Sequence, residues 1–333
     1  MQRVKGKVKV KMKVKARDRS AVLAVCGLVF LLCAGCAANG ARQLAAYERN
    51  IQRTTAALLA AGDADSLAAA SLLRYGPEVD PAERLTLITR AVAAAPERPD
   101  LIWLNIAACI QVESCDPAPL AAQLQGVDPA NGAAWFVSIG PAGKLNDQAA
   151  VRKNMAAIAA STRFDIYWNA TIVRVTNAVL RTKTMDLRTA FSATIGVAAA
   201  KIIPAYQSIV NACKGESLKD PAVVATCRQV ASVMRRGDTY ITEMIGVAIA
   251  KRAWPEGSAE YIDAASARRV ARYRMDTDGK IELHQIWTSR YAAKRLQLMS
   301  ENKTEQEVIL AAIMNAKLSP NPPAGWTDPW AGS

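Results

Sequence analysis

Apolar residues recur at intervals of three and four along most of the chain beyond residue 64. Ile102, Ile106 and Ile110, for example, fall on one face of a helix. No segment sustains the alternation of apolar and polar residues that is typical of a half-buried strand. Alanine is abundant and aromatic residues make up only 6% of the chain. The pattern therefore predicts an all-α fold.

A longer period of about 33 residues runs through the first half of the chain. Trp103, Trp135 and Trp168 are separated by 32 and 33 residues, and each follows a segment that breaks a helix. A second helix is predicted between successive tryptophans, over residues 117–125 and 148–161. Such spacing is typical of stacked helical hairpins, in which each repeat covers the apolar face of its neighbour. We expect the three tryptophans to pack between the repeats.

This pattern resembles the tetratricopeptide family, whose repeat of 34 residues opens with Trp-x-x-Leu-Gly. Trp103 with Ile106 matches that opening, although alanine replaces the glycine, and Pro96 and Pro129 match the proline that ends a repeat. The resemblance covers residues 64–182 and implies an irregular α-solenoid. A helical bundle with a chance spacing of tryptophans is the alternative.

Beyond residue 183 the period is lost, although the helical pattern continues to residue 318. Helices are predicted over residues 185–213, 219–235, 238–254, 258–274, 280–300 and 304–317. Pro204 is expected to kink or split the first of them, and Asp238 is expected at a helix start. Asp276–Gly279 is predicted to be a turn between helices. Residues 319–333 are rich in proline and are predicted to form an extended or mobile tail.

The start of the chain has the layout of a secretory signal. The first nineteen residues carry a net charge of +8, and an apolar run over residues 21–34 follows. This order is typical of a signal peptide, and the run is shorter than the roughly 20 residues that cross a bilayer. We expect a signal peptide over residues 1–35 and a linker or helix over residues 36–63. An uncleaved anchor is the alternative. The basic region is unusually long for a signal peptide, and a start at Met12, with residues 1–11 untranslated, would explain its length.

Residues 32–36 resemble the lipobox of bacterial lipoproteins, in which a diacylglyceryl group is attached to the cysteine before cleavage. The last three residues match, but Cys33 stands where the family usually has leucine. The resemblance implies lipidation of Cys36 and an envelope protein, held by membrane lipid, that faces the periplasm. Ala37 is not the aspartate that retains enteric lipoproteins at the inner membrane, which favours the outer membrane. An ordinary signal peptide cut nearby is the alternative.

Most of the positive charge of the chain lies in this leader, so the net charge of the remaining chain is much lower. The formal net charge is +13, of which +5 remains for the 298 residues from Cys36 onward. Attraction of a nucleic acid requires a strong basic field. We therefore expect no nucleic-acid partner.

Four cysteines follow Cys36, and an even number in an exported chain indicates disulfides. The natural pairing is local, between Cys109 and Cys115 and between Cys213 and Cys227. Free buried cysteines are the alternative. A zinc site fits poorly, because neither pair has the two-residue spacing of a zinc knuckle and His284 is the only histidine.

No set of residues indicates catalysis. A mechanism based on histidine would have to use His284, which lies in a predicted helix without a nucleophile motif. Glu216 and Ser217 resemble the Glu-Ser pair of lytic transglycosylases, but the rest of that motif is missing. Asp276–Gly279 lacks the later ligands of a calcium loop. We expect no catalytic residue, no metal and no cofactor.

Four arginines crowd one predicted helix near the end of the chain. They are Arg268, Arg269, Arg272 and Arg274. Contact with anionic lipid heads or with an acidic partner is one interpretation, and a solvated helix face is the other.

The function most compatible with these features is non-catalytic binding, with the helical repeats serving as a scaffold or adaptor for a protein partner. Asn105, Ser138 and Asn169 follow the three tryptophans by one to three positions and are the candidate binding residues. The alternatives are a carboxylate-dependent cell-wall hydrolase and an immunity-type inhibitor of an envelope toxin. A deep pocket with two converging carboxylates would favour the hydrolase, and a shallow groove would favour the scaffold.

Overall fold

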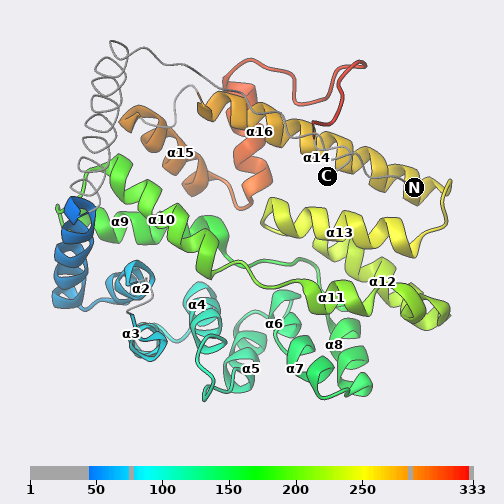
Figure 1. Cartoon of the computed structure of the whole chain (residues 1–333), viewed down its shortest axis with the longest axis horizontal. Coiled ribbons are helices and arrows are strands. Elements are labelled where there is room, and N and C mark those ends of the chain that lie inside the picture. The colour runs from blue at the N-terminus through cyan, green and yellow to red at the C-terminus, as the bar shows by residue number, and fades with distance from the viewer. Residues whose placement is uncertain (1–44, 75–78, 284–287, 330–333) are drawn as a thin grey trace, which may run out of the picture. The chain divides into compact units, whose positions relative to one another are not determined.

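The computed structural model describes residues 45–74, 79–283 and 288–329, and over these ranges the chain is all-helical (Figure 1). No β-strand occurs within them, and one isolated bridge joins Asn131 to Arg163. The prediction of an all-α fold is therefore confirmed. The predicted signal peptide and Cys36 lie outside the described residues. The chain divides into two units, residues 1–52 and 53–333, and the structure describes residues 45–52 of the first.

The second unit begins with a layer of short helices in which neighbours along the chain contact each other. They are α2 (Ala64–Leu73), α3 (Pro81–Ala94), α4 (Pro99–Cys109), α5 (Ala118–Val127), α6 (Ala133–Phe136), α7 (Ile139–Lys144) and α8 (Gln148–Ala160). This order of paired neighbours agrees with the predicted helical hairpins. The predicted helices at 117–125 and 148–161 correspond to α5 and α8.

A second layer packs on the first. It contains α9 (Trp168–Arg181), α10 (Leu187–Lys201), α11 (Gln207–Ala212), the 3-10 helix η1 (Gly215–Lys219), α12 (Pro221–Met234) and α13 (Tyr240–Ala253). α9 and α10 contact α2, whereas α12 contacts α8. The break between α10 and α11 contains Pro204, as predicted.

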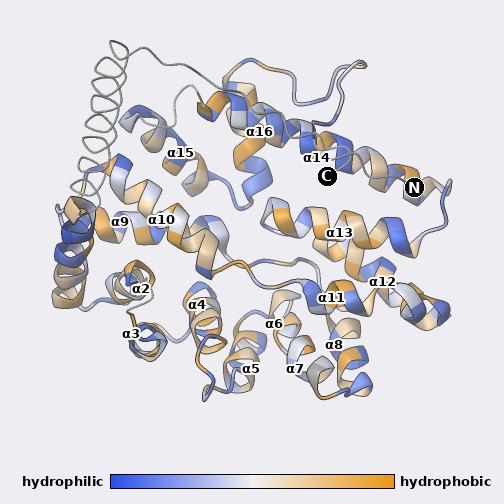
Figure 2. Ribbon diagram, viewed as in Figure 1, coloured by the Kyte–Doolittle hydropathy of each residue, from blue (hydrophilic) through white to orange (hydrophobic). Residues whose placement is uncertain are grey.

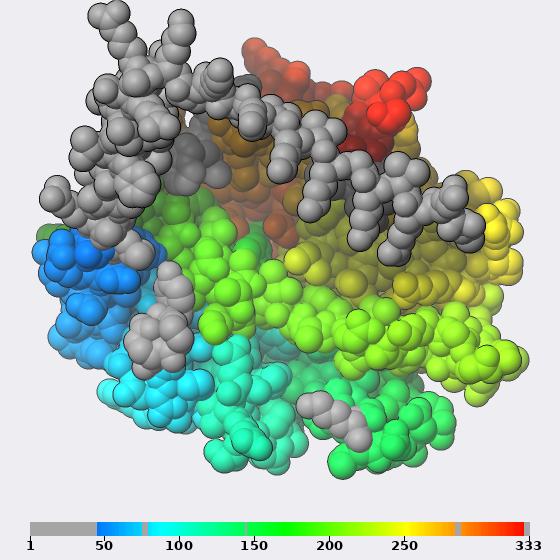
Figure 3. All heavy atoms as spheres, in the orientation of Figure 1, coloured from blue at the N-terminus to red at the C-terminus, as the bar shows by residue number. Residues whose placement is uncertain are grey.

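The third layer consists of α14 (Ala259–Leu283), α15 (Ser289–Glu301) and α16 (Glu305–Asn315). α14 contacts α13, and α15 contacts α9 and α10. α14 and α15 are more hydrophilic along their length than α4 (Figure 2). The space-filling view shows the helices of the first two layers lying side by side on one face (Figure 3).

Side-chain caps fix where many of these helices begin. An aspartate or threonine side chain at the N-cap accepts a hydrogen bond from a backbone N–H of the first turn, which satisfies a donor that has no partner inside the helix. These N-caps are Asp63, Asp80, Asp147, Asp186, Asp220, Thr239, Thr288 and Thr304. Thr304 and Glu307 form a full capping box at the start of α16.

The turn predicted at Asp276–Gly279 is wrong, because α14 continues through it to Leu283. Asp278 is buried and receives two hydrogen bonds from the guanidinium of Arg295 on α15, at 3.0 and 2.9 Å. Asp276 pairs with Lys280 one helical turn later. These pairs hold the segment in a helix against the turn propensity of its aspartates and glycine.

Asp238 does not cap the helix that follows it, as its position suggested, since Thr239 caps α13. Its carboxylate instead accepts hydrogen bonds from the backbone N–H groups of Ile166 (3.0 Å) and Trp168 (2.8 Å) at the start of α9. Burial, and then the charge of Asp165, raise the pKa of Asp238 well above its usual value. The main chain of Asp238 also accepts from Glu305 N–H at 2.8 Å. One residue therefore ties together the starts of α9, α13 and α16.

Candidate functional site

The three tryptophans take different positions. Trp103 in α4 is 2% exposed, and its indole Nε1 donates to the carbonyl oxygen of Ile202 at 3.3 Å. Trp168 is the buried first residue of α9, whereas Trp135 in α6 is only partly buried. Trp103 thus joins α4 to the end of α10, helices that are far apart in the sequence.

Two of the three candidate binding residues are used inside the fold. The amide oxygen of Asn105 accepts from the hydroxyl of Thr89 at 3.2 Å, and Asn169 Nδ2 donates to the carbonyl oxygen of Asn302 at 3.0 Å. Each side chain is buried. Ser138 is partly buried at the start of α7 and makes no capping hydrogen bond. The structure does not bring the three residues together on one exposed surface.

The two predicted cysteine pairs lie at disulfide-bond distance. Cys109 at the end of α4 joins Cys115, and Cys213 after α11 joins Cys227 in α12. The local pairing expected from the sequence is therefore the one found. The first bond closes a short loop after α4, and this loop borders the largest cavity described below.

That cavity, here called the apolar groove, has a volume of about 620 Å³ and lies between the end of α4, the disulfide loop, α6–α7 and the segment joining α10 to α11. Its lining includes Trp103, Ile106, Ile110, Val112, Pro117, Phe136, Val137, Pro141, Ile202, Ile203 and Pro204. Phe136 is supported from behind by Phe164 and Tyr206, with ring centroids 5.8 and 5.6 Å away. At the rim, Ile110 is 61% exposed. The size and apolar lining are typical of a binding site.

Two cations meet at one side of this groove. Gln111 Oε1 accepts hydrogen bonds from Arg84 Nη1 at 3.2 Å and from Lys201 Nζ at 3.3 Å. Arg84 is 5% exposed, and its Nε donates to the carbonyl oxygen of Ser71. Burial lowers the pKa of Arg84, and burial followed by the charge of Arg84 lowers that of Lys201. Two positive charges thus share one neutral acceptor.

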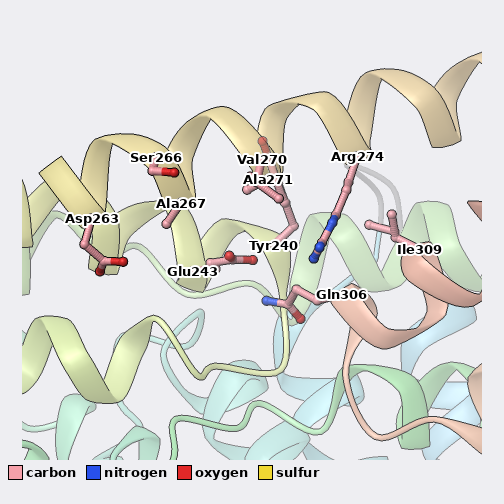
Figure 4. Close-up of a pocket in the computed structure, with 10 residues that line it drawn as sticks. All are labelled: Tyr240, Glu243, Asp263, Ser266, Ala267, Val270, Ala271, Arg274, Gln306 and Ile309. Carbon is pink, nitrogen blue, oxygen red and sulfur yellow. The ribbon is translucent and has the colours of Figure 1, made fainter. Parts of the chain in front are cut away.

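A second cavity, here called the polar pocket, has a volume of about 290 Å³ and lies between α13, α14 and α16 (Figure 4). Glu243, Arg274 and Gln306 point toward one another in it, whereas Asp263 lies toward one end. Gln306 Nε2 also donates to the carbonyl oxygens of Gly237 and Thr239, at 3.1 and 2.9 Å.

The two carboxylates of the polar pocket have different surroundings. Burial raises the pKa of Glu243 above its usual value, and the hydrogen bond with Gln306 and the charge of Arg274 oppose this rise. The side chain of Asp263 is 64% exposed and forms an ion pair with Arg235 at 2.8 Å. The pocket therefore holds one partly buried carboxyl whose pKa is raised and one exposed carboxylate with its own cation.

The arginine cluster on α14 holds the end of the chain. Its hydrogen bonds and ion pair join Arg269 to Pro323 and Trp326, Arg272 to Asp328, and Arg274 to Pro320. The ring of Trp326 also meets Tyr273 edge-on, with centroids 5.5 Å apart. The described part of the tail has no regular secondary structure, and it is docked on α14 through residue 328. The chain itself thus occupies three of the four arginines considered for an anionic partner.

The other residues considered for chemistry form no site. His284 lies outside the described residues. Glu216 and Ser217 lie in the exposed helix η1, where Glu216 pairs with Lys219 at 2.7 Å. Among the residues whose positions are described, no cluster of histidine, cysteine, aspartate and glutamate is suited to a metal ion.

Sequence reasoning missed both the apolar groove and the paired cations. Lys201 offered a signal, because it is the only charged residue between Arg188 and Lys214. The sequence around Arg84 and Gln111 gives no comparable signal, since their contact with Lys201 depends on how α3, α4 and α10 pack.

No helix in the described part of the chain is long and apolar enough to cross a membrane. No protein family model, curated protein or solved structure matches the chain.

Proposed function

We propose that this chain is a non-catalytic binding protein of the bacterial cell envelope. In this proposal acyl chains on Cys36 hold it in a membrane, with the outer membrane favoured, and its helical domain faces the periplasm. Its partner places an apolar group in the apolar groove. A scaffold or adaptor for a protein is the form that the sequence suggests.

The observation that carries the proposal is the apolar groove itself. Its volume of about 620 Å³ falls within the range of roughly 300–1,000 Å³ that is typical of ligand sites. An apolar group that leaves water for this groove gains about 25 cal/mol per Å² of buried surface. Ile110 adds a large exposed apolar side chain at the rim, where a partner would first make contact.

Binding of the uncharged dye Nile red to the purified protein tests the groove. Ile110→Asp should weaken dye binding at least tenfold, because it places a charge at the rim. Met314→Asp is the matched control, since Met314 is also 61% exposed but lies on α16, far from the groove lining in the sequence. Equal binding by the two variants would contradict the assignment of the groove.

The location is tested separately by mass spectrometry of protein extracted from membranes. A diacylglyceryl group on Cys36 as the first residue is expected, and Cys36→Ser should abolish it. An unprocessed, unmodified chain in the cytosol would overturn the proposed location and leave the groove experiment standing.

A carboxylate-dependent hydrolase is the second candidate, and Glu243 in the polar pocket is the observation that favours it. A partly buried carboxyl with a raised pKa is suited to donate a proton to a leaving group. Asp263 is a poor second carboxylate, because it is largely exposed and bound to Arg235. Release of soluble fragments from purified peptidoglycan, lost in Glu243→Gln, would support this candidate over binding.

A further inference from the structure

The paired cations beside the apolar groove lack a counter-charge. Neither Arg84 nor Lys201 forms an ion pair with a carboxylate among the residues that the structure describes, and both donate to Gln111 instead. Glu113 is the one acid in the groove lining, and it is exposed and makes no ion pair with either cation. Burial of a cation such as Arg84 without an anion is unfavourable, so an anion placed between Arg84 and the partly exposed Lys201 would be stabilised.

Gln111 occupies the place that such an anion would take. Its side chain is exposed, so it can swing into solvent without disturbing the core. A carboxylate in its place would meet Lys201 directly and Arg84 behind it. A carboxylate would add the attraction between opposite charges to these hydrogen bonds, which the neutral amide of Gln111 does not supply.

The lining of the groove indicates whether the anionic group belongs to a peptide or to a hydrocarbon chain. The wall is built from helices and loops, so it offers no strand edge with which an extended peptide could pair. Peptide N–H and C=O groups would lose their water hydrogen bonds on the apolar lining. A hydrocarbon chain has no such groups, so it loses no hydrogen bonds with water when it enters the groove.

We propose that the apolar groove binds a fatty acid, with the hydrocarbon chain along the groove and the carboxylate between Lys201 and Arg84 in the place of Gln111. This inference rests on the proposed binding function, and it replaces a protein partner by a small lipid. The groove then distinguishes its ligand by the charge of the head group as well as by its apolar chain.

Isothermal titration calorimetry on the disulfide-bonded protein tests this with three amphiphiles of equal chain length. The two ionic ones are kept below their micelle concentrations, and dodecanol is kept below its solubility limit. Dodecanoate should bind at least tenfold more tightly than dodecanol, and dodecyltrimethylammonium should bind most weakly. Shortening the acid to decanoate should weaken binding by roughly fourfold for each methylene removed.

Three substitutions and one control, Lys153→Gln, assign the binding to these residues. Lys201→Gln should weaken dodecanoate at least tenfold and leave dodecanol unchanged, whereas Lys153→Gln, at an exposed site on α8, should change neither. Gln111→Glu supplies an internal carboxylate to both cations. It should raise the melting temperature and remove the preference for dodecanoate over dodecanol. Ile110→Asp should weaken both ligands.

Equal affinity for dodecanoate and dodecanol, unaffected by Lys201→Gln, would overturn the anion site and leave the groove as an apolar site. Binding of dodecanoate that is unaffected by both Lys201→Gln and Ile110→Asp would place it elsewhere and would also overturn the inference. Binding of none of the three amphiphiles would overturn it too. If Nile red binding were also insensitive to Ile110→Asp, the proposed function itself would fail.

Discussion

The carboxylate of Asp238 accepts a hydrogen bond from the backbone N–H of Trp168, 70 residues earlier in the chain, at 2.8 Å. The same carboxylate holds Ile166 N–H, so the start of α9 is capped by a residue from the loop before α13. Tyr167 at this start has a φ of 59°, in the left-handed region that is unfavourable for a residue with a Cβ. The cap from Asp238 offsets that cost.

Asp238→Ala should lower the free energy of unfolding by about 2–4 kcal/mol, because two buried N–H groups would lose their acceptor. Asp147→Ala removes an exposed N-cap from α8 and should cost only about 1 kcal/mol. Urea unfolding followed by circular dichroism measures both. Equal losses in the two variants would show that Asp238 acts as an ordinary cap.

Removal of the two disulfides should have unequal effects. The bond between Cys213 and Cys227 spans 14 residues, and that between Cys109 and Cys115 spans 6. Restriction of the unfolded chain predicts losses of about 3 kcal/mol for the longer loop and about 2.4 kcal/mol for the shorter. Replacing each pair by two alanines and measuring unfolding in urea tests this order. A larger loss for the shorter loop would mean that its bond stabilises the folded groove wall as well.

The ion pair between Asp278 and Arg295 should respond differently to single and double substitutions. Both side chains are at most 10% exposed. Asp278→Ala leaves the buried guanidinium with only the longer contact to Glu282, at 3.9 Å, and should cost about 3–5 kcal/mol. Replacing Asp278 by Leu together with Arg295 by Met removes both charges and should cost less. Thermal and urea unfolding of the two variants decide this, and a double variant as unstable as the single one would contradict it.

The pH dependence of the unfolding free energy should reveal the raised pKa of Glu243. Its pKa is raised in the folded protein by burial, so the folded state binds the proton more tightly than the unfolded state does. Its contribution to stability is complete below pH 4.5, the usual value, and is lost as the pH rises through the folded pKa. Glu243→Gln should flatten this fall at pH values above 4.5. An unchanged slope of unfolding free energy against pH would contradict the assignment.

The sequence predicted most helices because their signals are local. The apolar period, the break at Pro204 and the spacing of the cysteines all act within a few turns of the chain. The turn at Asp276–Gly279 was predicted wrongly because that prediction also used local sequence only. The contact with Arg295, which is distant in the sequence, outweighs the local turn propensity. The site was not predictable in this way, because Arg84, Gln111 and Lys201 meet only through packing. Whether the first half belongs with tetratricopeptide-like repeats stays a prediction.

The docked tail has a mechanical consequence. Residues 320–328 return from the end of α16 and are fastened along α14 by the arginines and Trp326. A pulling force applied at the end of the chain would therefore load these contacts before it reached α16. Residues 320–328 would then detach from α14 first and lengthen the chain, while the packed helices stayed folded.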